Sequence, residues 1–232
     1  MSEKLSLKRA WGSHCDLLVF ADRNAPGMNV SWEESYDKIS RKSHQAWSLM
    51  HTKYGAKFDF FMKADLDTYI ITKNLHAYIR LFNPGEPYYI GKQFVHPEFG
   101  PFVAGAAIIL SRRTLSSFYE AAQTGVENCS EKQFSSFASA EDLAMGVCLQ
   151  SLGIYPHNTR NEVNEERFMV FNVDYMYDSS SGISSQQWYK RFSFNPSFGN
   201  SCCSSEAIAF HKISPENMQH ILKYANGRWN WA

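Results

Sequence analysis

The 232-residue sequence contains no apolar run that approaches the roughly 20 residues of a membrane-spanning helix. Its start also lacks the apolar core of a signal peptide, because Ser2, Glu3 and Lys4 are polar. Lysine plus arginine and aspartate plus glutamate each number 23, so the formal net charge is zero. This balance gives no support for a nucleic-acid or anionic-membrane partner. The absences together predict a soluble chain.

Cys-x-x-Cys spacing is also missing, which argues against a thiolate zinc site. The five cysteines are Cys15, Cys129, Cys148, Cys202 and Cys203. An odd number predicts one free thiol, or a partner outside this chain. Two Asn-x-Ser glycosylation patterns begin at Asn29 and Asn128. Together with the cysteines, they favour a secretory compartment, where disulfides persist.

The chain is 44% apolar and 15% aromatic, enough for a substantial core. Apolar runs that indicate strands alternate with patterns that indicate helices, which predicts an α/β domain with an at least partly parallel sheet. Strands are expected at 17–21, at the apolar run 60–62 that leads into Asp65, at 88–91 and at 207–211, and residues 102–110 are expected to form a small-residue turn that runs into a strand. Helices are expected at 33–54, 73–82, 113–123, 140–152 and 215–224, with one helix ending near Trp11. Loops are expected at 22–27, 127–139 and 175–199. No repeat or linker interrupts this pattern, so residues 1–232 are expected to form one domain.

The helix predicted over 33–54 has apolar residues spaced for one buried face. These residues are Tyr36, Ile39, Ala46, Leu49 and Met50. Gly55 is well placed to end the helix.

An acidic pair follows the apolar run Phe60-Phe61-Met62. Asp65 and Asp67 are two residues apart, and side chains at that spacing share one face of a strand. Two such carboxylates suit a hard cation, which in turn would neutralise the phosphates of a nucleotide-sugar. The alternative is a turn in which Asp and Thr side chains cap the following helix.

Glu141 and Asp142 stand at the start of another predicted helix. Acidic residues are common there because they complement the helix dipole, and that alone accounts for them. The functional alternative is a general base that takes the proton from an attacking hydroxyl.

His211 ends the strand predicted at 207–211. A lone histidine is more often a hydrogen-bonded structural residue than a ligand, yet a neutral imidazole also completes carboxylate sites for manganese or a similar ion.

An aromatic cluster lies in the region predicted to be irregular. Its members are Trp188, Tyr189, Phe192, Phe194 and Phe198. The cluster is either a small satellite core beneath a loop or a stacking wall for a sugar or peptide acceptor.

The order of these motifs resembles a known family. The motifs are Lys8-Arg9-Ala10-Trp11-Gly12, Lys63-Ala64-Asp65-Leu66-Asp67-Thr68-Tyr69, Ala104-Gly105-Ala106-Ala107, Glu141-Asp142-Leu143-Ala144-Met145-Gly146 and Cys202-Cys203-Ser204-Ser205-Glu206-Ala207-Ile208-Ala209-Phe210-His211. They resemble the core 1 β1,3-galactosyltransferases, or T-synthases, within the β1,3-glycosyltransferases that include Fringe. The likeness extends over nearly the whole chain, and its most specific part is the segment 202–211.

The resemblance implies a GT-A fold and an inverting transfer of galactose from UDP-galactose. The acceptor would be the 3-hydroxyl of O-linked N-acetylgalactosamine on a glycoprotein, and Mn²⁺ would be the cofactor. It also implies a Golgi protein, attached to the membrane only through an anchor outside this chain, and a homodimer is compatible with it.

The resemblance further implies roles for individual residues. Asp65, Asp67 and His211 match the metal site, and Asp142, with Glu141 beside it, matches the base. Lys63, Asp65 and Gly105 are expected at the nucleotide-sugar, and Trp188 and Tyr189 at the acceptor.

Three departures from the family pattern bear on activity. Leu66 replaces the usual middle aspartate of the acidic motif. In the small-residue turn, Ala104 and Ala106 carry methyl groups that crowd a site where backbone approaches a ligand. The family's first strand is missing, so the chain is expected to be N-terminally truncated. The alternative function is therefore a catalytically impaired relative that acts as a chaperone or binding partner of the active transferase. Transfer of N-acetylglucosamine is a further alternative, disfavoured by the Cys202-Cys203 segment.

Overall fold

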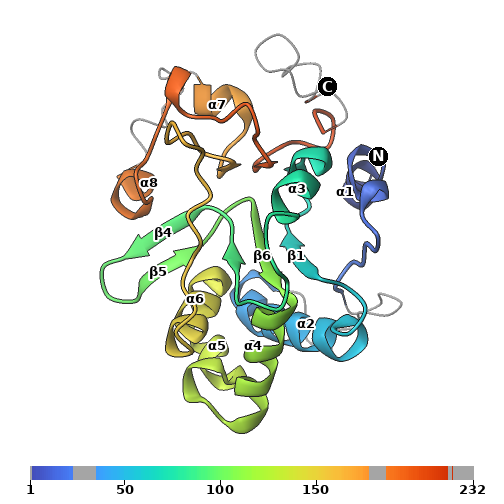
Figure 1. Ribbon diagram of the computed structural model, residues 1–232, viewed down its shortest axis with the longest axis vertical. Helices are drawn as coiled ribbons and strands as arrows, with labels where there is room; N and C mark the ends of the chain where they lie inside the picture. The colour runs from blue at the N-terminus through green and yellow to red at the C-terminus, as the bar shows by residue number, and fades with distance from the viewer. Residues whose placement is uncertain (1, 23–34, 178–186, 219–220, 222–232) are drawn as a thin grey trace.

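The computed structural model of the protein describes residues 2–22, 35–177, 187–218 and 221 (Figure 1). Its α-helices are α1 (Glu3–Ala10), α2 (Ile39–Tyr54), α3 (Thr72–Ile79), α4 (Arg112–Thr124), α5 (Glu131–Ser136), α6 (Glu141–Ser151), α7 (Val173–Tyr177) and α8 (Gln187–Phe192). Its strands are β1 (Phe60–Ala64), β2 (Tyr69–Ile70), β3 (Tyr89–Ile90), β4 (Gln93–His96), β5 (Gly100–Val103), β6 (Ala107–Ser111), β7 (Phe168–Met169) and β8 (Ala209–Phe210). None of the described helices combines the length and the apolar character needed to cross a membrane.

The strands form three small sheets. β6 is buried along its whole length and pairs antiparallel with β1 on one side and β3 on the other. β8 pairs antiparallel with β2 and parallel with β7, while β4 and β5 form a hairpin. The chain is therefore a mixed α/β protein, and the expectation of some parallel pairing is confirmed at β7 and β8.

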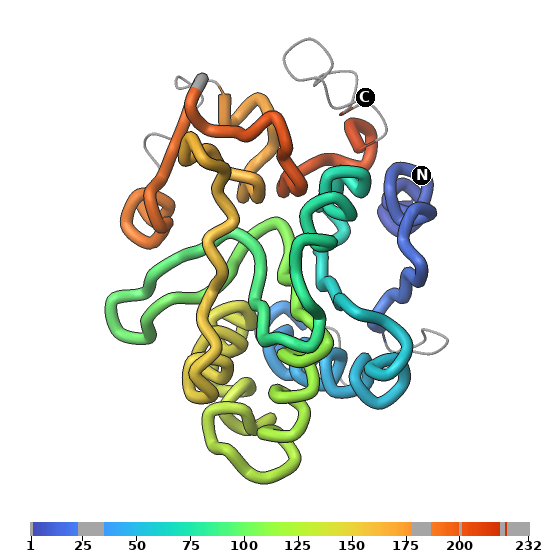
Figure 2. Tube along the Cα trace, viewed as in Figure 1, coloured from blue at the N-terminus to red at the C-terminus, as the bar shows by residue number. Residues whose placement is uncertain are grey.

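The helices divide between two hydrophobic cores. Figure 1 shows α2, α4, α5 and α6 gathered at one end of the central sheet, around a core that contains Trp47, Phe118 and Leu149. A disulfide between Cys129 and Cys148 ties the 3-10 helix Glu127–Cys129 to α6 in this core. The second core lies around the β2–β8–β7 sheet. Figure 2 shows there that α3 lies beside the C-terminal part of the chain.

The remaining cysteines have different surroundings. Cys202 and Cys203 form a disulfide between sequence neighbours, and both are buried. Cys15 has no disulfide partner and is half-buried. The odd number of cysteines therefore leaves one free thiol, as one of the two alternatives predicted.

The strand predicted at 17–21 is wrong, because the structure has irregular backbone there. A strand forms only beside a partner strand. β1 is the edge strand of the central sheet and leads into the acidic pair; it pairs with β6, and no described strand pairs with its other edge. Residues 17–21 instead line a cavity of about 450 Å³ together with β1. The central sheet is thus open at β1.

The apolar face predicted for α2 is also wrong. The buried positions are Ser40, Ser43, His44 and Trp47, whereas Tyr36 is exposed. Of the predicted face, Ile39, Ala46 and Met50 line the cavity beside β1. The predicted apolar residues of the helix therefore lie toward this cavity, while Trp47 packs in the core around α5 and α6 with Ser40, Ser43 and His44 buried beside it.

Two regions predicted as loops contain helices. Residues 127–139 include α5, whose N-cap Ser130 accepts a hydrogen bond from Gln133 N, and residues 175–199 include α8. The helix predicted over 215–224 lies largely outside the described residues, and 215–218 form a turn. The helices predicted at 73–82, 113–123 and 140–152 are confirmed to within a few residues.

Gly105 takes part in a close approach between two chain segments. Its φ is +87°, and a Cβ there would lie 2.3 Å from Val170 Cγ1. The flanking Ala104 and Ala106 have their methyl groups in the core. The backbone approach at this turn is therefore to Val170, and only glycine fits it.

We expect Gly105→Ala to destabilise the protein by about 2–5 kcal/mol, because left-handed strain and overpacking add. Gly125→Ala is the matched control, since Gly125 has φ +82° and no heavy atom within 4 Å of an added Cβ; strain alone should cost about 1–2 kcal/mol. Urea denaturation measures both, and adding Val170→Ala should recover part of the Gly105→Ala loss. Equal losses for the two glycines would show that Val170 is not the constraint.

Candidate active site

The acidic turn between β1 and β2 is held from two sides. Thr68 N donates to Asp65 O at 3.0 Å, and Thr68 Oγ1 donates to Ala106 O at 2.9 Å. Trp11 Nε1, from the end of α1, donates to Thr68 O at 2.9 Å. Thr68 is fully buried, so these bonds fix the backbone that carries Asp65 and Asp67.

The register of two strands brings His211 to this turn. Tyr69 of β2 lies opposite Phe210 of β8, and Ile213 N donates to Asp67 O at 2.9 Å. His211 Nε2 then lies 3.0 Å from Asp67 Oδ1 and 3.5 Å from Asp65 Oδ2. The three residues offer ligand atoms within 4.8 Å of one another, so the convergence predicted from their chemistry is confirmed.

This cluster fits a divalent ion. His211 Nε2 is buried and, despite facing two carboxylates, makes no well-directed hydrogen bond with any described residue. Buried polar atoms normally have such a partner, so its orientation toward the carboxylates needs an explanation. Two carboxylate oxygens and one imidazole nitrogen form a donor set that suits a divalent transition-metal ion.

The cluster also shifts the pKa values of its members. Burial acts to raise the pKa of Asp65, but Lys63 and His211 outweigh it and hold that pKa well below its usual range. Burial acts to lower the pKa of His211, but Asp65 and Asp67 outweigh it and raise that pKa above its usual value. A proton on His211 therefore competes with any ion at the same nitrogen.

Lys63 links the acidic turn to the start of α6. Its Nζ donates to Asp65 Oδ1 at 2.8 Å and to Glu141 Oε1 at 2.5 Å. Ser43 Oγ of α2 donates to the other Glu141 oxygen at 3.1 Å. Burial acts against the charge of Lys63, but Glu141 and Asp65 more than offset it and raise the pKa of Lys63. Glu141 is thus committed to a structural ion pair.

Asp142 is the neighbouring carboxylate in the first turn of α6. Its Oδ1 accepts a hydrogen bond from the adjacent Leu143 N at 2.8 Å, and its place in the first turn fits the helix-dipole interpretation. Burial, with Glu141 beside it, raises the pKa of Asp142 to about 7. A carboxylate with such a pKa exchanges a proton near neutral pH, which suits a general base.

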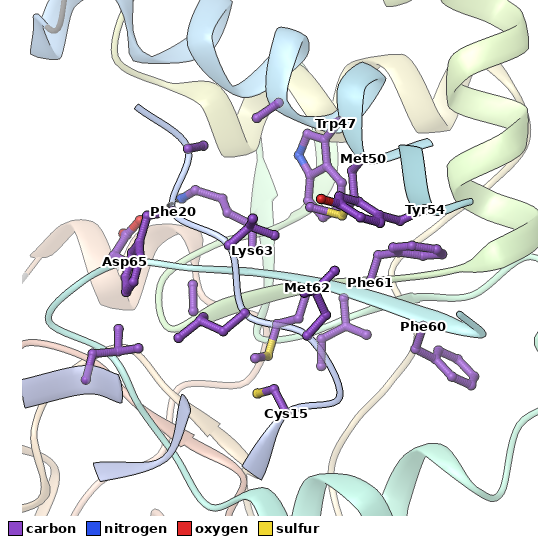
Figure 3. A pocket seen from close by; sticks show the side chains of 18 of the residues that line it. Cys15, Phe20, Trp47, Met50, Tyr54, Phe60, Phe61, Met62, Lys63 and Asp65 are labelled. Atoms are coloured by element: carbon purple, nitrogen blue, oxygen red, sulfur yellow. Dashed lines mark hydrogen bonds and ion pairs between the residues drawn. The ribbon is translucent and has the colours of Figure 1, made fainter. Parts of the chain in front are cut away.

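The cavity beside β1 reaches the acidic turn. Figure 3 shows Asp65 and Lys63 near one end and Phe60, Phe61 and Tyr54 toward the other. Leu66, which replaces the family's middle aspartate, also lines the cavity, whereas Gly105 does not. Of the residues expected at the nucleotide-sugar, Lys63 and Asp65 are therefore together on its wall, and Gly105 lies apart.

The two residues expected at the acceptor differ in exposure. Trp188 is 44% exposed and stacks on Phe94 with ring centroids 5.9 Å apart. Tyr189 is 1% exposed and packs edge-on against Phe94 and Phe198. Successive residues of α8 thus point to solvent and to the core, and only the Trp188 ring faces solvent.

Sequence analysis missed Ser43 and Trp11 as supports of the site. Ser43 was overlooked because the buried face of α2 was assigned to its apolar stripe. Trp11 was placed at a helix end, but the sequence offers no signal for its hydrogen bond to Thr68, 57 positions away.

Comparison of the sequence with known proteins shows which proteins this chain is similar to. No protein-family model matches the chain. It is 32% identical, over 229 residues and 96% of its length, to glycoprotein-N-acetylgalactosamine 3-beta-galactosyltransferase 1 of Xenopus laevis. The chain is thus similar along nearly its whole length to a core 1 β1,3-galactosyltransferase.

Two other relatives are more distant from this chain. Chondroitin sulfate synthase 3 of Homo sapiens and of Mus musculus are each 26% identical over 139 residues, 55% of this chain and 14% of the relative. The chain spans 61% of the length of the frog relative. The resemblance seen in the motifs is thus confirmed as a similarity to this relative over nearly the whole of this chain.

The cluster of Asp65, Asp67 and His211 predicts stabilisation by metal. Mn²⁺ at 100 times its Kd should stabilise the native state by about 2.7 kcal/mol and raise the Tm by roughly 5–10 °C. Asp67→Asn and His211→Ala should remove most of this shift, whereas His14→Ala, at an exposed histidine, should retain it.

The Mn²⁺-induced shift should also grow with pH. Because the pKa of His211 is raised, its proton is lost, and its nitrogen freed, only as pH passes above the usual value of about 6.5. Differential scanning fluorimetry measures this trend at roughly pH 5.5–8, a range that includes the usual histidine pKa of about 6.5 and values above it. A shift that survives His211→Ala would remove His211 from the ligand set.

Proposed function

We propose that the protein is an inverting β1,3-galactosyltransferase that moves galactose from UDP-galactose to the 3-hydroxyl of O-linked N-acetylgalactosamine on glycoproteins. The observation that carries the proposal is the convergence of Asp65, Asp67 and His211 on one point, next to a carboxylate with a raised pKa. The name of the frog relative supports the same sugar and acceptor for this chain. A family member with this chemistry would work in the Golgi lumen.

The donor side would use the acidic turn. Asp65, Asp67 and His211 would hold Mn²⁺, which neutralises negative charge on a departing diphosphate. Lys63 keeps Asp65 ionised and in place, because it donates to that carboxylate at 2.8 Å while Glu141 holds Lys63 from the other side. Lys63 and Asp65, on the wall of the cavity, are the nucleotide-sugar residues of this proposal.

The acceptor side would use Asp142 as base. Its carboxylate takes the proton from the acceptor O3 as that oxygen bonds to C1 of galactose. The bond between C1 and the phosphate oxygen breaks on the opposite face, and the electron pair leaves with UDP. One displacement inverts the anomeric carbon and requires no nucleophile on the protein. Trp188, whose ring is exposed, would stack on the acceptor.

A second function has one observation in its favour. Leu66 places an apolar side chain on the wall of the cavity, at a position where the family resemblance predicts a nucleotide contact. A catalytically impaired relative that binds the active transferase would tolerate this change. The convergence of Asp65, Asp67 and His211 favours the enzyme, because a binding partner does not need a metal site.

The test is a UDP-galactose transfer assay on a peptide that carries N-acetylgalactosamine on serine or threonine, with and without Mn²⁺. We expect transfer that depends on Mn²⁺ and a β1,3 linkage in the product. A folded protein that binds Mn²⁺ but transfers no sugar would favour the chaperone-like alternative.

Asp142→Asn should abolish transfer, with a loss of roughly 10²–10⁴-fold in kcat, because the amide cannot accept the proton. UDP binding measured by calorimetry should stay largely intact. The kcat/KM of the unmodified protein should rise as pH increases through about 7, where Asp142 loses its proton. Asp37→Asn, an exposed carboxylate changed in the same way, is the control and should leave both unchanged. Persistent transfer by Asp142→Asn would exclude Asp142 as the base.

A further inference from the structure

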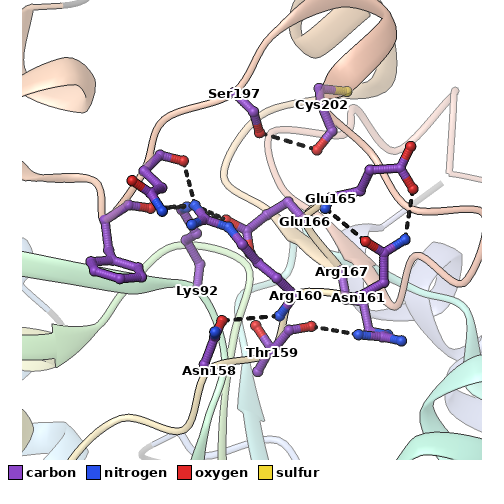
Figure 4. Close-up of polar contacts among 12 residues, drawn as sticks. Lys92, Asn158, Thr159, Arg160, Asn161, Glu165, Glu166, Arg167, Ser197 and Cys202 are labelled. Carbon is purple, nitrogen blue, oxygen red and sulfur yellow. Dashed lines mark hydrogen bonds and ion pairs between the residues drawn. The ribbon is translucent and has the colours of Figure 1, made fainter. Parts of the chain in front are cut away.

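Three charged residues far from the metal cluster are buried together. Lys92, Arg160 and Glu166 have side chains that are 1%, 3% and 3% exposed. Lys92 Nζ and Arg160 Nη2 both donate to Glu166 Oε2, the latter at 3.2 Å (Figure 4). Two cations thus share one carboxylate, which leaves one positive charge in excess in a buried place. Such a charge is costly unless other acceptors compensate it.

The compensating acceptors come from the loop that follows α8. Lys92 Nζ donates to Phe194 O at 3.2 Å, and Arg160 Nη2 donates to both Phe194 O and Asn195 O. The Arg160 guanidinium also lies 5.3 Å from the centroid of the Phe194 ring. The carbonyls of this loop are therefore part of the ionic cluster.

The same loop has an unusual backbone. Asn195 has φ +49°, a left-handed conformation that persists where the surroundings determine it. Ser193 pairs with Phe94 of β4, and Phe194 N donates to Gln93 O at 3.1 Å. Cluster, loop and β4 together set where α8 ends, and α8 carries Trp188 against Phe94.

We propose that Lys92, Arg160 and Glu166 form a positioning group that fixes the loop after α8 and thereby holds the exposed ring of Trp188 at the acceptor side of the site. The acceptor role of Trp188 rests on the proposed function. The position of α8 does not, and it has its own measurement below. The group touches no reacting atom, so its effect is on acceptor binding and not on the chemical step.

Two further contacts connect the group to the segment that ends in His211. Glu166 N donates to Cys202 O at 3.1 Å, and Ser204 N donates to Glu166 O at 2.8 Å. Glu166 is thereby anchored on both sides of the vicinal disulfide. These bonds fix the backbone of the residue whose carboxylate both cations share. If the contacts of the group are broken, we therefore expect the loop after α8 to move and Glu166 to stay in place.

Arg160→Met is the decisive variant, because it leaves Lys92 and Glu166 as a balanced ion pair. Arg167→Met is the matched control: Arg167 is also a largely buried cation over an aromatic ring, Tyr78, but it donates to Thr159 and Glu206 and not to the loop. Arg160→Lys keeps the charge but removes the Nη2 group that donates to both carbonyls. It serves as the milder variant if Arg160→Met folds poorly.

The first readout is tryptic cleavage at Lys190 and Arg191, both exposed on α8, followed by mass spectrometry. Losing charge-assisted bonds to the loop should speed this cleavage about tenfold in Arg160→Met and less in Arg160→Lys. Arg167→Met should cleave at the rate of the unmodified protein. Equal rates in Arg160→Met and Arg167→Met would overturn the proposal, whether or not the protein transfers sugar.

The second readout separates positioning from a general loss of structure. Arg160→Met should raise the KM for the glycopeptide acceptor about tenfold, with the KM for UDP-galactose unchanged, because only the acceptor side loses its wall. A parallel rise in both KM values would indicate general loosening and contradict the proposal. If the unmodified protein transfers no sugar, the proposed function fails, and the cleavage rates alone decide the inference.

Discussion

The site depends on the antiparallel pairing of β2 with β8, two residues each. This short ladder joins an acidic turn near residue 66 to a histidine near the end of the described chain, and the hydrogen bond from Ile213 N to Asp67 O extends it. Because side chains alternate along a strand, a shift of one residue in the register would turn His211 away from Asp67. The cores around this ladder, with Phe210 and Ile70 fully buried, hold the register in place.

The charged side chains around that ladder differ in their partners and in their burial. Lys63 lies between Asp65 and Glu141 and donates to both carboxylates, which ties β1 to α6. Asp142 lacks such a partner, so burial raises its pKa to about 7. Two adjacent acids at one helix start thus differ: Glu141 is held in an ion pair, and Asp142 has a raised pKa, as the proposed base requires. On the aromatic side, the proposed positioning group of Lys92, Arg160 and Glu166 has the corresponding role, and the backbone bonds of Glu166 to Cys202 and Ser204 connect it to the segment that ends in His211.

Local sequence patterns predicted the parts of the fold that are determined by residues close together in the sequence. An apolar run ending in Asp65 and Asp67, and an acidic start to α6, were correctly placed because strand ends and helix starts have local signals. The strand predicted at 17–21 is wrong because an apolar run does not determine pairing: among the described residues these five line the cavity beside the open edge of β1 and form no ladder with it. The same open edge explains α2, whose apolar stripe faces the cavity and not a filled core. Trp188 and Tyr189 show the limit at single residues, since only packing decides which neighbour is exposed.

The most direct test of the central claim is to collect X-ray data on crystals grown with Mn²⁺, at a wavelength where manganese scatters anomalously. The account predicts one strong anomalous peak within coordination distance, about 2.0–2.3 Å, of Asp67, His211 and Asp65 or a water that it holds. A peak elsewhere, or His211 turned away from Asp67 with no peak between them, would contradict the account.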